Sequence, residues 1–189
     1  IEANAGFTEN LTGRFTLGWA DAELDSASQD TFETFPTYAP DGDVSGNKLL
    51  RQPEWLASGS LDYQHVLIED WDWYAGADVN YQSSVYVGND NQSWLPEHTY
   101  VNTRLGLRNG QYTLEFWTRN LFEDGNPIAA FRDIYWANND GQYPVNGVYP
   151  DQGPRPDFDD FVPLRYTVTY PRERTFGLNM QMRFGAAVR

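Results

Sequence analysis

The last strand-like segment of the chain alternates apolar and polar residues without interruption. From Phe176 to Phe184 every second residue is apolar, and the residues between them are small or polar. Side chains of an extended strand alternate between its two faces, so this segment has one apolar face and one polar face. A soluble sheet would bury the apolar row in a core, whereas a membrane barrel turns it toward lipid and keeps a wet interior.

Six further segments share this period of two, and together the seven predict an all-β fold of antiparallel, up-and-down strands. Several are about 10 to 16 residues long, whereas soluble strands average about 5 to 6 and tilted membrane strands need about 9 to 11. Strand length therefore favours a transmembrane β-barrel. The seven segments cover roughly residues 1–7, 11–19, 55–67, 72–87, 101–108, 112–119 and 166–184.

Short and long connections alternate between these segments. If neighbouring strands are antiparallel, all short turns lie at one end of the sheet and all long connections at the other. Outer-membrane barrels have this asymmetry, with short periplasmic turns and long extracellular loops. The short connections are residues 8–10, about 68–71 and Asn109-Gly110, and the long ones are about 23–53, 88–97 and 122–165.

Charged residues in the polar rows argue against a small soluble barrel, because unpaired buried charges are costly. A soluble sandwich that exposes the polar rows to water is the alternative. The aromatic residues favour the membrane interpretation. They fall in two groups, one at each rim of the expected barrel, where membrane barrels have girdles of interfacial aromatic residues. Trp19 and Trp55 fall near the outer rim, and Trp73, Tyr112 and Phe184 fall near the inner rim.

The composition excludes other classes. The chain of 189 residues has a formal net charge of -14, which disfavours nucleic acid as a partner because phosphate contacts need clustered Lys and Arg. No apolar run reaches the roughly 18 residues that a membrane helix needs. Cysteine is absent, which excludes disulfides and thiolate metal sites. The start at Ile1 shows neither an initiator Met nor a signal peptide, so we expect an excerpt of a longer protein.

Four stretches resemble the C-terminal barrel strands of TonB-dependent outer-membrane receptors. GNKLLRQPEWLASGSLDY resembles a loop-to-strand segment of that family, and HTYVNTRLGLR resembles its third-from-last strand. QYTLEFWTRNLFED resembles the penultimate strand, with Asn120-Leu121-Phe122 at the position of a recurrent Asn-Leu pair. YPRERTFGLNMQMRF resembles the closing strand, in which Arg174, Phe176, Gly177 and Phe184 match the usual spacing.

The resemblance implies that residues 1–184 form the C-terminal third of a larger barrel, about 22 strands in all, in a bacterial outer membrane. It further implies an N-terminal plug domain and TonB as partners through the full-length chain, with energy-coupled uptake of a scarce nutrient such as a siderophore or an oligosaccharide. Residues 185–189 would be a short C-terminal extension. The alternatives are a small outer-membrane barrel that acts as a passive pore, anchor or adhesin, and a soluble carbohydrate-binding β-sandwich.

We expect no enzymatic activity and no catalytic residue. His65 and His98 are the only histidines and have no nucleophile signature near them, and no phosphate-binding glycine loop is present.

The long connections are the predicted ligand surface. They contain 15 of the 27 acidic residues, seven from Asp21 to Asp43 and eight from Glu123 to Asp160. Aromatic faces beside carboxylates can stack against a sugar or hold a cationic group, although solvated surface is the simpler explanation. The candidate ligand-binding residues are Phe131, Tyr135, Trp136, Tyr143 and Tyr149.

Two further predictions concern charged residues. Asp41, Asp43 and Ser45 occupy positions one, three and five of a calcium-loop pattern with Gly46 at position six, but Gln52 replaces the bidentate Glu at position twelve. Calcium is therefore one interpretation and a plain acidic turn the other, and no other cofactor is expected. The second prediction is a plug-facing row in the barrel interior, comprising Arg104, Arg108, Glu115 and Arg119.

Overall fold

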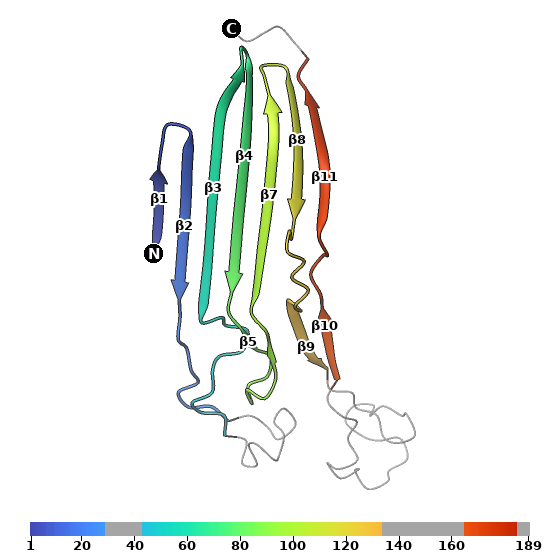
Figure 1. The fold of residues 1–189 in the computed structure, drawn as a ribbon. Coiled ribbons are helices and arrows are strands. Elements are labelled where there is room, and N and C mark those ends of the chain that lie inside the picture. The colour runs from blue at the N-terminus through green and yellow to red at the C-terminus, as the bar shows by residue number, and fades with distance from the viewer. Residues whose placement is uncertain (29–42, 134–164, 185–189) are drawn as a thin grey trace, which may run out of the picture.

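The computed structural model describes residues 1–28, 43–133 and 165–184. These residues form β-strands, turns and extended connections, and no helix occurs among them (Figure 1). The described ranges accordingly hold no helix that is long and apolar enough to cross a membrane. The fold of this part of the chain is all-β, as predicted.

Seven antiparallel strands form one sheet in which each strand pairs with the next long strand along the chain. This up-and-down order is the one predicted, and the last strand pairs with residues 112–119. The sheet is open, with β1 and β11 at its two edges (Figure 1). The strands are β1 (Glu2–Gly6), β2 (Leu11–Trp19), β3 (Trp55–Ile68), β4 (Trp71–Gln82), β7 (His98–Arg108), β8 (Tyr112–Arg119) and β11 (Thr175–Met182).

All short turns lie at one end of this sheet, the upper end in Figure 1, and the long connections leave from the other. In the turn between β7 and β8 the side-chain oxygen of Asn109 accepts hydrogen bonds from the backbone amides of Gln111 and Tyr112, at 2.9 and 2.6 Å. Such a side-chain turn closes the hairpin tightly. The predicted asymmetry of the connections is confirmed.

The prediction of one long strand from residue 166 to 184 is wrong. Residues Arg165–Thr169 form β10, which pairs with β9 (Ala129–Asp133) in a separate two-stranded sheet. The chain leaves the β conformation between β10 and β11, where Pro171 has no amide hydrogen to donate. The carbonyl of Arg172 instead accepts a hydrogen bond from the Asn120 side chain at 3.1 Å.

The fourth predicted segment also ends early. β4 stops at Gln82, and Ser83 then exchanges two 3.0 Å hydrogen bonds with the backbone of Trp55. The next residues form β5 (Val85–Tyr86), which pairs with β6 (Trp94–Leu95). This hairpin turns away because its apolar residues fill a small core at the long-connection end. That core consists of Val85, Val87, Leu95 and Ala130, with Tyr166 packed against it.

The strand register joins the apolar rows into one continuous face. Leu105 lies between Ala75 of β4 and Phe116 of β8, and Phe116 is in turn paired with Leu178. Side chains of this face are open to the surroundings at the β11 edge, where Phe176, Leu178 and Met180 are 71%, 70% and 81% exposed. In the described ranges the buried apolar side chains are only Val44 and the four of the small core. The large sheet therefore leaves its apolar face uncovered.

Candidate functional site

The opposite face of the sheet carries a network of charged and polar side chains. Arg104 on β7 donates to the carboxylate of Asp62 on β3, so this ion pair reaches across β4. It can do so because the residue beneath it is Gly76, where a Cβ would lie 2.6 Å from Arg104 Nε and 2.8 Å from Asp62 Oδ1. Both charged side chains are about half exposed. The pair is therefore held within the sheet and still borders an open surface.

A second set of contacts continues the network toward the short-turn end. The hydroxyl of Tyr74 donates to Glu115 at 3.0 Å, and the same carboxylate accepts from the Asn179 amide at 3.1 Å. Arg108 donates to Gln64 at 2.6 Å, and its guanidinium lies 5.5 Å from the centre of the Tyr74 ring. These contacts link strands β3, β4, β7, β8 and β11. They surround a polar hollow of about 620 Å³.

The predicted interior row is only partly brought together. Arg104, Arg108 and Glu115 all line this hollow. Arg119 lies on the same face at the end of β8, and its guanidinium is 5.1 Å from the centre of the Trp117 ring. Arg119 therefore belongs to the long-connection end of the polar face and does not line the hollow.

Replacement of Gly106 by Ala should disturb this network. A Cβ at Gly106 would lie 2.3 Å from Cζ of the Tyr74 ring, so the tyrosine must move and give up its bond to Glu115. We expect a loss of about 1 kcal/mol in stability, the usual value of one hydrogen bond, because the displaced ring borders an open hollow. Thermal unfolding of the full-length protein measures this loss. Gly6→Ala is the matched control, since no atom lies within 4 Å of its Cβ position, and an equal effect of the two changes would contradict the prediction.

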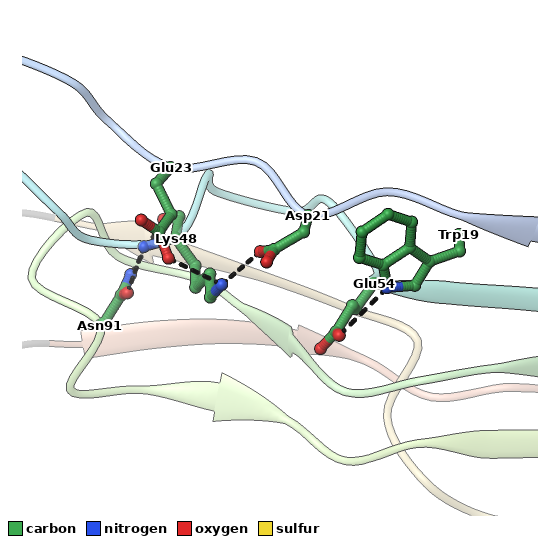
Figure 2. Close-up of polar contacts among 6 residues, drawn as sticks. All are labelled: Trp19, Asp21, Glu23, Lys48, Glu54 and Asn91. Carbon is green, nitrogen blue, oxygen red and sulfur yellow. Dashed lines mark hydrogen bonds and ion pairs between the residues drawn. The ribbon is translucent and has the colours of Figure 1, made fainter.

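The long connections are tied to one another by polar contacts, as Figure 2 shows for the first two. The Lys48 ammonium donates to Asp21 and, at 2.9 Å, to Glu23. The backbone amide of Lys48 donates to the Asn91 side chain at 2.7 Å, and Asn91 donates back to the Lys48 carbonyl at 3.1 Å. The hydrogen bond to Asp21, and to a smaller extent the one to Glu23, raises the pKa of Lys48 above its ordinary value.

The third long connection joins the others through aromatic residues. The guanidinium of Arg51 lies 4.3 Å from the centre of the Phe131 ring, and the hydroxyl of Tyr166 is 2.8 Å from that of Ser93. Phe131, a predicted ligand residue, is about half exposed and is already engaged by Arg51. The other predicted ligand residues, Tyr135, Trp136, Tyr143 and Tyr149, lie outside the described residues.

The calcium prediction can be examined only in part, because Asp41 lies outside the described residues. Asp43 accepts a hydrogen bond from the Ser45 amide at 2.9 Å, and hydrogen bonding by Ser45 lowers the pKa of Asp43. Gly46 has a φ of 80°, which suits the sharp turn of a calcium loop and of an acidic turn equally. Within the described ranges no group of three His, Asp or Glu residues could hold a metal ion.

A buried asparagine organises the corner where β8 ends. Asn120 has a φ of 51° and is only 6% exposed. Its side chain accepts from the amide of Asp124 at 2.9 Å and donates to the carbonyls of Asp124 and Arg172 at 2.9 and 3.1 Å. Its own amide donates to the Asn102 side chain at 3.1 Å. The Asn-Leu resemblance marked this position, but the residue types alone did not predict its structural role.

A comparison with protein-family models and with curated proteins found no match to this chain.

Proposed function

We propose that the chain is part of the wall of a TonB-dependent outer-membrane receptor that takes up a scarce nutrient, with siderophores and oligosaccharides as the candidate ligands. The observation that carries this proposal is the contrast between the two faces of one open sheet. One face is apolar and exposed in register across seven strands, and the other holds charged side chains joined by hydrogen bonds. The apolar face suits contact with lipid on the outside of a barrel, and the polar face suits its water-filled interior.

The aromatic side chains at the two ends of the apolar face support the same assignment. The rings of Trp19 and Trp55 lie 6.2 Å apart where β2 ends and β3 begins, next to the long connections. At the short-turn end the rings of Tyr63 and Trp73 lie 5.0 Å apart. Aromatic residues are typical of both interfaces of membrane barrels, and the indole of Trp19 also donates to Glu54 at 3.3 Å, as a residue at a wet boundary can (Figure 2).

The interlocked long connections suit the outer mouth of such a receptor. They hold most of the acidic residues, and the contacts of Asn91, Arg51 and Tyr166 join three of them to one another. In this proposal the polar hollow beside Arg104 and Glu115 faces the plug domain, whose polar groups would complete its hydrogen bonds.

Single-cysteine labelling of the full-length receptor in outer-membrane vesicles tests the proposal, because the chain described here has no cysteine. Leu178→Cys on the apolar face and Gln181→Cys on the polar face lie on the same strand. We expect a small, charged, water-soluble thiol reagent to modify Gln181→Cys and to leave Leu178→Cys unmodified until the membrane is dissolved. Equal labelling in intact vesicles, or recovery of the protein in the soluble fraction, would refute the membrane assignment.

Energy coupling needs a separate measurement. We expect the full-length receptor to form a crosslink with TonB in intact cells, and a receptor that reaches the outer membrane without contacting TonB would instead be a passive pore, anchor or adhesin.

A further inference from the structure

A second hollow, which we call the outer hollow, lies on the polar face at the end of the sheet from which the long connections leave. It has a volume of about 280 Å³, close to the lower limit of roughly 300 Å³ for small-molecule pockets. It lies where β2, β3, β4 and β7 are side by side, and the register places Leu56, Gln82 and His98 in one row across it. On β2 this row ends at Gly18, which has no side chain and therefore leaves one side of Leu56 uncovered.

The hollow presents several hydrogen-bonding groups that the protein does not use. Among the described residues Gln82 and His98 have no side-chain hydrogen-bond partner, although the His98 ring packs 5.1 Å from that of Tyr100. The hydroxyls of Thr16 and Ser58 bond to each other at 2.6 Å, which leaves each with further capacity. The amide of Asn80 donates to Asp78 at 3.2 Å, and its carbonyl oxygen is unused within the described ranges.

The residues that line this hollow include no Lys, Arg, Asp or Glu. The hollow near the short turns is different, because two arginines and three carboxylates line it. An anionic ligand at the outer hollow would find no cation there and would first pass connections rich in carboxylates, on a chain of net charge -14. A cationic ligand would find no carboxylate in the lining. The uncharged lining of the hollow and the acidic connections around its entrance together favour a neutral ligand.

We propose that the outer hollow binds one sugar residue of a neutral oligosaccharide. The hydroxyl, amide and imidazole groups match the many donors and acceptors of a sugar, and the half-exposed Leu56 offers an apolar surface to its C–H groups. The inference rests on the proposed receptor function, because only there would this end of the wet face meet incoming nutrient. It selects an oligosaccharide over an anionic ferric siderophore as the transported ligand.

Titration calorimetry on the purified full-length receptor in detergent tests this inference. The probes are maltotriose, xylotriose, laminaritriose and tri-N-acetylchitotriose as neutral trisaccharides, and a ferric tris-catecholate as the anionic competitor class. We expect at least one trisaccharide to bind, and Gln82→Ala and His98→Ala each to weaken it at least tenfold. Gln181→Ala is the matched control, because Gln181 lies on the same face near the short turns and should leave the affinity unchanged.

Three results would overturn the inference for a receptor that is folded and located in the outer membrane. One is the absence of binding by all four trisaccharides, another is binding that Gln82→Ala and His98→Ala leave unaltered, and the third is binding of the ferric complex alone. Failure of the membrane assignment itself would appear in the cysteine labelling, so the two failures are distinguishable.

Discussion

Leu61→Arg should strongly reduce the amount of receptor assembled in the outer membrane, whereas Ser60→Arg should leave assembly nearly unchanged. Leu61 lies near the middle of β3 on the apolar face, paired with Gly13 and Ala77, and is half exposed. Arg on the lipid side of a barrel costs about 2 to 4 kcal/mol at the bilayer midplane. The heat-modifiable folded band of the full-length receptor, measured in outer-membrane fractions, reports the assembled amount.

Ser60→Arg is a matched control because it adds the same side chain one residue away on the opposite face. Ser60 lies between Arg14 and Asp78 on the polar face, so an added guanidinium stays in water, and the Asp78 carboxylate on one side offsets the like charge of Arg14 on the other. Equal losses from both changes would indicate a general intolerance of β3 and would contradict the assignment of the faces. Full assembly of Leu61→Arg would show that lipid does not cover this position.

The strand order and the two faces were predictable from the sequence for a specific physical reason. Neighbouring strands are joined either by a tight turn at one end of the sheet or by a longer loop at the other, so each strand lies beside the next one along the chain. The alternation of apolar residues then determines which face of the sheet each side chain occupies. Asn109-Gly110 is the clearest case, because its turn sets β7 against β8 and aligns Leu107 with Leu114.

The partners across the polar face were not predictable in the same way. Asp62 and Arg104 are separated by an intervening strand, and their contact depends on the absence of a side chain at Gly76. No local pattern in the sequence links three residues on three strands. The predicted interior row identified the face of Arg104, Arg108 and Glu115, but it missed Asp62 and Tyr74 as their partners.

The sequence does contain a sign of the break between β10 and β11, but the regular alternation of apolar residues on either side concealed it. Pro171 interrupts a segment whose apolar residues continue on either side of it, and a proline inside a strand pattern argues for a break. The departure of β5 from β4 was harder to foresee. It depends on Val85 and Val87 meeting Leu95 and Ala130, and Ala130 comes from a distant part of the chain.

Asn120→Ala should cost about 3 to 5 kcal/mol, the largest effect we expect from a single substitution outside the apolar face. Three part-buried side-chain hydrogen bonds would be lost at about 1 kcal/mol each, and the backbone groups of Asp124 and Arg172 would lose this partner. Alanine at a φ of 51° adds about 1 to 2 kcal/mol of backbone strain. The thermal unfolding midpoint of the full-length receptor should fall accordingly.

Two further substitutions separate these contributions. Asn120→Gly tolerates the left-handed backbone, so it should recover about 1 to 2 kcal/mol relative to alanine while the hydrogen bonds stay lost. Asn126→Ala removes a single 2.8 Å side-chain bond to the Glu97 carbonyl and should cost about 1 kcal/mol. If Asn120→Ala were no more destabilising than Asn126→Ala, the corner at the end of β8 would not depend on Asn120. The joining of β8 to the segment before β11 would then rest on Arg174, which pairs with Glu123 at 3.2 Å and donates to the Leu121 carbonyl at 3.4 Å on the exposed surface.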